Sequence, residues 1–146
     1  MERVTDMMTK DPACCTPETS LQEVAALMIK FDCGEIPVVD SLTERRIAGV
    51  ITDRDICCRT VAKGLNPLNM KTSDVMTFPA ITVNLEATLD LCCDIMEREK
   101  IRRLPVVDDY EKVCGIISLG DIARKKDAHI VDILRDISQP KGTSIQ

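Results

Sequence analysis

Two short motifs pair a hydroxyl side chain with a carboxylate three residues later: Thr52 with Asp55, and Ser118 with Asp121. A carboxylate accepts hydrogen bonds from two neighbouring hydroxyl groups, and a Ser or Thr hydroxyl donates or accepts beside it, so this chemistry fits a ribose. The same spacing caps the first turn of a helix without any ligand. The residues alone leave both interpretations open, because a cap in the free protein is compatible with ribose binding.

The two motifs belong to two copies of one longer pattern. Pro-Val-Val-Asp occurs at 37–40 and again at 105–108, 68 positions later. Gly-Val-Ile-Thr at 49–52 matches Gly-Ile-Ile-Ser at 115–118, 66 positions later. The change in spacing places a two-residue deletion between these stretches, where a turn is expected. The duplication predicts two similar units related by a pseudo-two-fold axis.

Each unit is predicted to contain a short strand, a helix, two strands and a second helix. Apolar residues at i, i+3, i+4 and i+7 indicate one buried face on each first helix: Leu21, Val24, Ala25 and Met28 in the first copy, and Leu89, Cys92, Cys93 and Met96 in the second. Ser20 and Glu23 form a capping box before the earlier helix. Residues 36–39 and 47–51 predict a hairpin, since their connection is too short for a parallel crossover.

The predicted fold class is therefore α+β, with two β-α-β-β-α repeats packed through their sheets and one additional helix. The expected organisation is a first repeat at 1–63, a linker at 64–71, a second repeat at 72–126, and a C-terminal helix and tail at 127–146. An apolar stripe at 130–137 predicts the last helix. Its apolar face is expected to lie on the body of the protein or on a partner, and the sequence does not choose between them.

Composition limits the classes of function. The chain has 146 residues, 45% of them hydrophobic but only 2% aromatic, so the core is expected to be aliphatic. No apolar run is long enough to span a bilayer, and the first residues lack the apolar region of a secretory signal, which predicts a cytoplasmic protein without membrane contact. A net charge of -5 argues against a general nucleic-acid-binding surface.

Eight cysteines raise the question of a metal or redox site, but none of them forms a Cys-x-x-Cys pair. Six of them align with an aliphatic residue at the equivalent position of the other copy: Cys15, Cys33, Cys57, Cys92, Cys93 and Cys114. This alignment predicts that they are small buried hydrophobic residues in a reducing compartment. Cys14 and Cys58 are equivalent to Thr82 and Arg124, so they are the candidates for exposed, reactive thiols. His129, the single histidine, is expected on the surface of the last helix and cannot form a zinc site alone.

The motifs, in this order and repeated, resemble the cystathionine β-synthase (CBS) domain in its usual tandem pair. The resemblance covers about residues 4–126 and depends on stretches at 74–77, 89–96, 101–108 and 115–122. Shorter strings at 52–56, 64–67 and 128–131 look like the small hypoxic-response members of this family. The resemblance implies a stand-alone regulatory module that binds AMP, ADP, ATP or S-adenosylmethionine in clefts between its units, requires no cofactor and forms a homodimer.

By this resemblance, Thr52, Asp55, Ser118 and Asp121 bind the ribose. Segments before each first helix are implied neighbours of the adenine: Ala13, Cys14 and Cys15, and Ala80, Ile81 and Thr82. Arg103 occupies the position from which this family reaches a ligand phosphate, and Arg102 should then turn away because successive strand residues face opposite sides. Alternatively, both arginines are solvated edge charges.

The first copy departs from the family pattern at this position, with Gly34 and Glu35 in place of the two arginines. A carboxylate repels a polyphosphate, so the two clefts are not expected to be equivalent. One competent nucleotide cleft and one weakened, altered or empty cleft are expected.

Three functions therefore compete. The leading one is a non-catalytic sensor that binds an adenosyl ligand and regulates an unknown protein. The second is an interaction or dimerisation module whose clefts have lost their ligand, a hypothesis motivated by Glu35. The third is an enzyme or a thiol redox switch, against which the sequence offers no Ser-His-Asp set, no metal-binding constellation and no second histidine.

Overall fold

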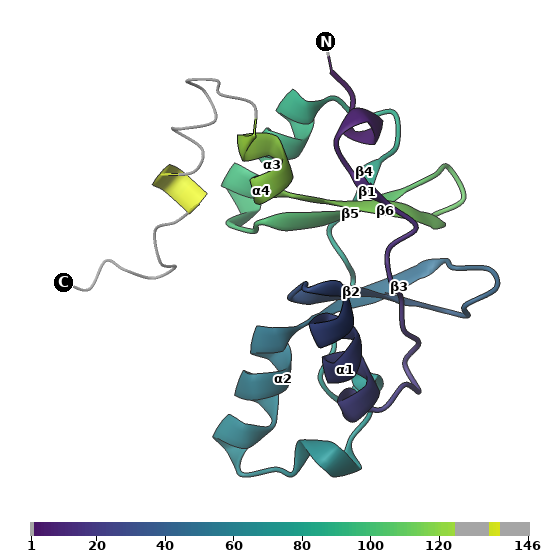
Figure 1. Cartoon of the computed structure of the whole chain (residues 1–146), viewed down its shortest axis with the longest axis vertical. Coiled ribbons are helices and arrows are strands. Elements are labelled where there is room, and N and C mark those ends of the chain that lie inside the picture. The colour runs from purple at the N-terminus through teal and green to yellow at the C-terminus, as the bar shows by residue number, and fades with distance from the viewer. Residues whose placement is uncertain (1, 125–134, 138–146) are drawn as a thin grey trace.

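Two β-sheets face each other at the centre of the molecule, and helices cover their outer faces (Figure 1). The computed structural model describes residues 2–124 and 135–137. The first unit has a two-stranded sheet and two helices: β2 (Glu35–Val39), β3 (Ile47–Thr52), α1 (Leu21–Phe31) and α2 (Asp53–Arg59). The second unit has a sheet in the order β1-β6-β5-β4 and two helices: β1 (Thr9–Lys10), β4 (Val83–Asn84), β5 (Arg103–Val107), β6 (Val113–Ser118), α3 (Leu89–Glu99) and α4 (Leu119–Ala123).

This architecture confirms the α+β fold and the repeated pattern of elements. Both predicted hairpins are antiparallel and carry the same irregularity, between Val38 and Val39 in one and between Val106 and Val107 in the other. The Ser20 hydroxyl accepts a hydrogen bond from the Glu23 backbone N–H at 3.1 Å, which is the N-cap half of the capping box predicted at the start of α1.

The second helix of the first unit is short. It ends at Arg59 and is followed by a 3₁₀ turn, Val61–Lys63. The Thr60 hydroxyl donates to the Ile56 carbonyl oxygen, which is the acceptor that the backbone N–H of Thr60 would use in a continuing α-helix. A threonine side chain therefore competes with the helix at its last turn.

The segment before each first helix packs on the other unit. The Val4 N–H donates to the Ala87 carbonyl oxygen at 2.9 Å, and β1 pairs with β6 of the second unit. The equivalent contact runs in the opposite direction, since the Thr72 N–H donates to the Thr19 carbonyl oxygen at 2.8 Å. The two repeats thus exchange their leading segments, and each unit contains residues from both halves of the chain.

Glycine at one equivalent strand position permits this exchange. A Cβ atom on Gly49 would lie 2.5 Å from the Thr77 carbonyl oxygen, and one on Gly115 would lie 2.8 Å from the Thr9 carbonyl oxygen. Any side chain at these positions would push the crossing segment away from the strand. The glycines are therefore required where the leading segments lie against β3 and β6.

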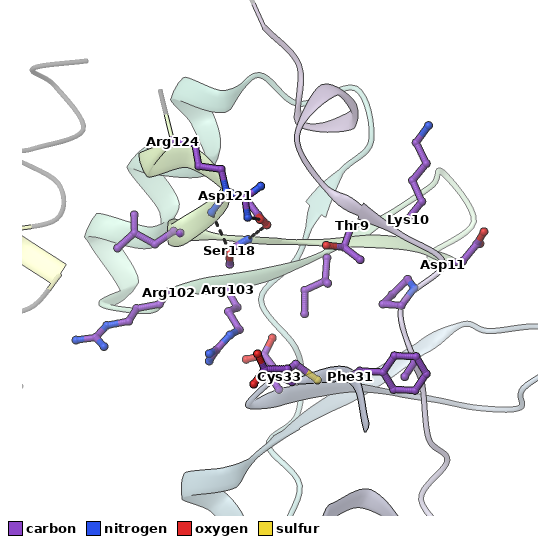
Figure 2. A pocket seen from close by; sticks show the side chains of 17 residues that line it. Thr9, Lys10, Asp11, Phe31, Cys33, Arg102, Arg103, Ser118, Asp121 and Arg124 are labelled. Carbon is purple, nitrogen blue, oxygen red and sulfur yellow. Dashed lines mark hydrogen bonds and ion pairs between the residues drawn. The ribbon is translucent and has the colours of Figure 1, made fainter. Parts of the chain in front are cut away.

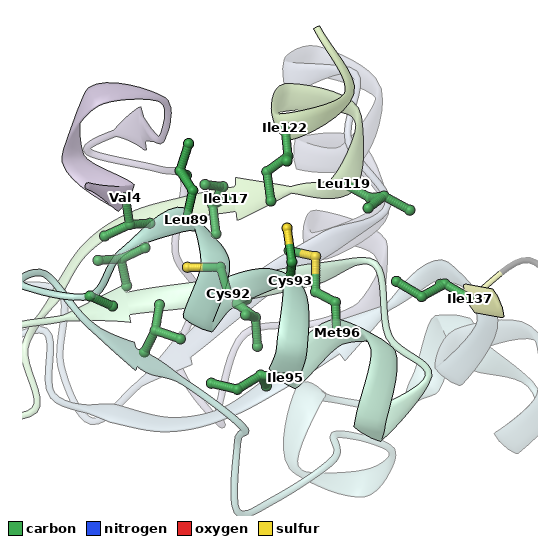
Figure 3. Close-up of a cluster of buried hydrophobic side chains, with 14 residues drawn as sticks. Val4, Leu89, Cys92, Cys93, Ile95, Met96, Ile117, Leu119, Ile122 and Ile137 are labelled. Atoms are coloured by element: carbon green, nitrogen blue, oxygen red, sulfur yellow. The ribbon is translucent and has the colours of Figure 1, made fainter. Parts of the chain in front are cut away.

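The core is aliphatic, as predicted, and forms a cluster in each unit. The cluster of the second unit contains Val4 from the crossing segment and Ile137 from the C-terminal region, packed on α3 and α4 (Figure 3). The cluster of the first unit contains Val75 from the other crossing segment. Residues 135–137 are helical, and burial of Ile137 places this part of the predicted C-terminal helix on the body of the protein. The remainder of that helix lies outside the described residues.

The two units meet along a seam between their hairpins. The Ile47 N–H donates to the Glu111 carbonyl oxygen at 2.8 Å, and the Val113 N–H donates to the Arg45 carbonyl oxygen at 2.9 Å. These two bonds are equivalent under the repeat, so the pseudo-two-fold axis passes between them. Val39, Val107 and Val113 form a third apolar cluster at this seam. The prediction that the repeats pack through their sheets is confirmed.

Candidate functional site

A cleft of about 750 Å³ opens at the seam between the two units. Its walls come from β5, β6 and the start of α4 in the second unit, from the beginning of β2 in the first, and from the crossing segment between β1 and α1. We call it the Ser118 cleft; the lining residues that matter below are Thr9, Ala13, Glu35, Arg103, Ser118 and Asp121. Its volume is in the range of small-molecule sites in proteins.

Ser118 and Asp121 are held in a fixed arrangement at the entrance of α4 (Figure 2). The Ser118 hydroxyl accepts from the Asp121 N–H at 3.1 Å, and Asp121 Oδ2 accepts from the Ser118 N–H at 3.0 Å. Arg124 Nη2 donates to Asp121 Oδ1 at 3.1 Å. The capping interpretation is therefore confirmed. Each carboxylate oxygen still has a lone pair that can accept a further hydrogen bond, and the cap fixes the orientation of the carboxylate.

Thr52 and Asp55 form the same reciprocal cap at the start of α2. Here the carboxylate has an additional partner, because the Thr77 hydroxyl lies 3.3 Å from Asp55 Oδ2 and 3.4 Å from Oδ1. Arg59 also lies 3.7 Å from Asp55 Oδ1. The equivalent of Thr77 is Thr9, which lines the Ser118 cleft. The two motifs thus share their backbone geometry but differ in how many protein groups already surround the carboxylate.

Arg103 and Glu35 both line the Ser118 cleft. The sequence predicted two clefts that differ, because Glu35 stands where the other copy has Arg103. The structure brings both residues to one cleft, where they act on each other electrostatically. Burial raises the pKa of Glu35 to about 7, more than the attraction of Arg103 lowers it, and repulsion from Asp55 raises it further. Arg102 also borders the cleft, but it is exposed while Arg103 is partly buried, and Figure 2 draws their guanidinium groups apart.

The other candidate residues are divided between the crossing segments. Ala13 lines the Ser118 cleft, whereas Cys15 is buried and pairs with Val38 beside β2. Ala80, Ile81 and Thr82 lie on the second crossing segment, between Thr77 on the first unit and β4 on the second. Sequence analysis missed Thr9 and gave Glu35 no place in this cleft. The equivalence of Thr9 to Thr77 was visible in the repeat and could have directed attention to it.

The cysteines follow the repeat only in part. Cys15, Cys92 and Cys93 are buried as predicted, while Cys33 and Cys114 are half-buried. Cys57 is exposed, so its predicted burial is wrong: α2 buries none of its residues, and a small side chain there meets no core.

Cys58 is exposed, as expected for a candidate reactive thiol. Cys14 is only half-buried, and burial raises the pKa of its thiol more than the neighbouring Arg45 lowers it, which disfavours the reactive thiolate. His129 lies outside the described residues. Within residues 2–124 and 135–137, no group of three or more His, Cys, Asp or Glu side chains is arranged to hold a metal ion.

Comparison with known proteins identifies the family. The model of the CBS domain matches residues 4–59 and 73–128, so the chain belongs to the CBS domain family and carries two copies of the domain. It is 38% identical over 123 residues to the CBS domain-containing protein YhcV of Bacillus subtilis, a match that covers 84% of each chain. It is 29% identical over 141 residues to hypoxic response protein 1 of Mycobacterium tuberculosis, covering 96% of each chain.

Solved structures of similar proteins contain adenosyl ligands. The CBS domain pair of protein MJ0100, in complex with 5′-methylthioadenosine and S-adenosyl-L-methionine, has a TM-score of 0.73 and 32% identity, covering 84% of this chain and 97% of that one. CBSX2 in complex with AMP has a TM-score of 0.71 and 26% identity, covering 85% of this chain and 95% of that one. None of the helices in the described part of this chain is long and apolar enough to cross a membrane.

Proposed function

We propose that this protein is a non-catalytic regulatory module that binds an adenosyl ligand in the Ser118 cleft. The observation that carries the proposal is the carboxylate of Asp121, which the Ser118 cap orients inside a cleft lined by both units. The ligands of the solved relatives, AMP, 5′-methylthioadenosine and S-adenosylmethionine, share a ribose and an adenine. In this chain the carboxylate accepts hydrogen bonds from the ribose hydroxyls, and the crossing segment at Ala13 lies against the base.

The geometry also supports a way to signal. A ligand in this cleft touches β6 and α4 of the second unit, Glu35 of the first unit, and the crossing segment that joins them. Its binding therefore favours one relative position of the two units over others. A ligand shifts such an equilibrium only by its difference in affinity for the two arrangements, typically about 1–3 kcal/mol. The changed surface is what a regulated partner protein recognises.

A thermal-shift experiment with AMP, ADP, ATP and S-adenosylmethionine tests the proposal. At a ligand concentration 100 times the Kd, the free energy of unfolding should rise by about 2.7 kcal/mol. Asp121→Asn should abolish most of this gain, because it replaces an ionised acceptor of the ribose hydroxyls. Asp94→Asn is the matched control, since Asp94 is exposed on α3. No stabilisation by any of the four compounds at millimolar concentration would refute adenosyl binding.

Substitution at Asp55 compares the two motifs. Asp55 already has Thr77 and Arg59 around its carboxylate, so Asp55→Asn should reduce ligand-induced stabilisation less than Asp121→Asn does. Equal losses in both variants would show that the first-unit motif contributes as much as the Ser118 cleft.

Homodimerisation, the regulated partner and a cytoplasmic location stay predictions. Large apolar side chains on the first unit favour an interface there: Ile29 is 84% exposed, Leu68 is 65% exposed and Val61 is 62% exposed. Light scattering of the wild type and of an Ile29→Glu variant checks the dimer. A monomer at micromolar concentration in both would contradict it.

A further inference from the structure

Glu35 and Arg103 occupy one equivalent position in the two units. Glu35 is the first residue of β2 and lies opposite Thr52, and Arg103 is the first residue of β5 and lies opposite Ser118. A duplication places the same residue type at both positions unless one copy changes. Here one position carries a carboxyl group and the other a guanidinium, and both groups line the same cleft.

The Arg103 guanidinium attracts the Glu35 carboxylate electrostatically without an ion pair between them. Arg103 is the main cation acting on Glu35, yet within the described residues no hydrogen bond or ion pair connects them. Glu35 Oε2 is buried and accepts no hydrogen bond from any residue that the structure describes. A buried polar atom without a partner is uncommon and costs about 1–3 kcal/mol. The pair therefore offers an acceptor and a donor that a ligand can satisfy together.

Carboxylates lie close to Arg103, in a cleft that Lys10, Arg102 and Arg124 also line. A Cβ atom on Gly34 would lie 2.9 Å from Asp53 Oδ2 and 3.4 Å from Arg103 Nη2, so that carboxylate and the guanidinium both border Gly34. Asp55 is near enough to repel Glu35. A phosphate that approached Arg103 would meet these carboxylates as well. A group with separate positive and negative ends matches this arrangement better than a purely anionic one.

We propose that the ligand of the Ser118 cleft is an adenosyl amino acid, in which the 5′ position of the nucleoside carries a chain ending in an ammonium and a carboxylate. Glu35 accepts a hydrogen bond from the ammonium, and Arg103 donates to the carboxylate. The ribose at Asp121 directs its 5′ substituent along this path, since Arg103 lies opposite Ser118 in the sheet. This inference rests on the proposed function and specifies its ligand class.

Calorimetric titration of the full chain with four adenosyl compounds tests the ligand class. S-adenosylmethionine and S-adenosylhomocysteine carry the amino acid group, whereas 5′-methylthioadenosine and AMP do not. The first two should bind at least about tenfold more tightly, because each hydrogen bond to a charged group contributes that much or more. S-adenosylhomocysteine has no sulfonium charge, so its tight binding would assign the preference to the amino acid group.

Two substitutions locate the recognition. Glu35→Gln and Arg103→Gln should each weaken S-adenosylhomocysteine at least about tenfold and change the affinity for 5′-methylthioadenosine by less than about twofold. Retained binding of the latter shows that the variant is folded. Arg98→Gln is the control, since Arg98 is exposed on α3 and pairs with Glu99.

The outcomes separate this inference from the proposed function. If 5′-methylthioadenosine or AMP binds the wild type as tightly as the two amino acid compounds, the ligand class is wrong while adenosyl binding stands. An unchanged affinity of S-adenosylhomocysteine for either glutamine variant overturns the roles of Glu35 and Arg103. If ADP or ATP stabilises the protein but neither amino acid compound binds, the ligand class is wrong while adenosyl binding stands. If none of these compounds binds, ADP and ATP included, the proposed function fails together with this inference.

Discussion

Replacing Glu35 with glutamine should remove a pH dependence of folding stability that the wild type shows near neutral pH. Burial raises the pKa of Glu35 from its ordinary value of 4.5 to about 7, although Arg103 opposes the rise. Between these pH values the folded protein holds a proton that the unfolded chain has lost. The stabilising contribution is therefore complete below pH 4.5 and disappears as the pH rises through about 7.

The magnitude follows from the difference between the two pKa values. Each pH unit of difference corresponds to about 1.4 kcal/mol, so the free energy of unfolding should fall by about 2–3 kcal/mol between pH 5 and pH 8. Glutamine is neutral throughout and has nearly the same shape. The variant should thus be more stable than the wild type at pH 8, by up to the same amount, and should match it most closely at pH 5.

Urea unfolding at several pH values, with a structural probe such as circular dichroism, measures this difference. The difference between the free energies of unfolding of the two proteins at each pH removes the contribution of the other titrating groups, which both proteins share. Glu23→Gln is the control, because Glu23 is exposed on α1 and its replacement should leave the pH profile unchanged. A difference between wild type and Glu35→Gln that stays constant within about 0.5 kcal/mol from pH 5 to pH 8 would refute the reasoning.

Three further predictions concern packing and thiols. Gly49→Ala should destabilise the protein by about 1–3 kcal/mol in urea unfolding, since its Cβ would lie 2.5 Å from the Thr77 carbonyl oxygen. Gly120→Ala, whose Cβ would lie 3.6 Å from Ser118 Oγ, should be neutral or stabilising, and equal effects of the two would contradict the close approach. Ile137→Ala should lower the free energy of unfolding by about 2 kcal/mol or more in the same assay, because Ile137 is buried in the core cluster of the second unit. An unchanged stability would contradict that burial. A thiol reagent should label the exposed Cys57 and Cys58 rapidly. Cys92 should react only on unfolding, because it is buried and burial raises the pKa of its thiol to about 12. Mass spectrometry of the labelled peptides measures the order of reaction, and labelling of Cys92 before Cys57 and Cys58 would contradict its burial.

Local patterns predicted the elements because the duplication supplied an internal control. The stripe that begins at Leu21 and the stripe that begins at Leu89 both became helices at those residues. The hairpins also formed where short apolar runs flank a turn. Each expectation could be compared with an equivalent stretch 66 or 68 positions away, so chance matches in one copy were filtered by the other.

The exchange of leading segments could not be predicted from the sequence. The backbone N–H of Val4 pairs with the Ala87 carbonyl oxygen, and that of the equivalent Thr72 pairs with the equivalent Thr19 carbonyl oxygen, so the sequence pattern is the same with or without the exchange. A symmetric duplication makes the exchanged and the unexchanged connections nearly identical in local contacts. Only the length and path of the chain between the units decide between them, and no residue type reports on that path.

The residue types of the candidate site could be predicted from the sequence, but their arrangement in space could not. Ser118 and Asp121 were recognisable by spacing alone, because a hydroxyl and a carboxylate three residues apart have one local geometry at a helix start. The meeting of Glu35 and Arg103 depends on how two sheets face each other across a seam, which spacing does not encode. The exposure of Cys57 on α2 could not be predicted either, because the alanine at the equivalent position, Ala123, is compatible with a buried or an exposed site.

Exchange and duplication together explain how one cleft can acquire specificity. Each cleft of a symmetric pair starts with the same groups, and a substitution in one copy enters a space that both copies line. The carboxyl group at position 35 therefore lies in the surroundings of Arg103, a residue of the other copy, while the cap that holds Asp121 is formed within the second unit. In the proposed binding mode the ribose contact depends on the second unit alone, whereas the 5′ end is lined by Arg103 of the second unit and Glu35 of the first. If the proposed ligand class is correct, a substitution at Glu35 alone should change the selectivity among adenosyl compounds and leave the fold and the proposed ribose contact in place.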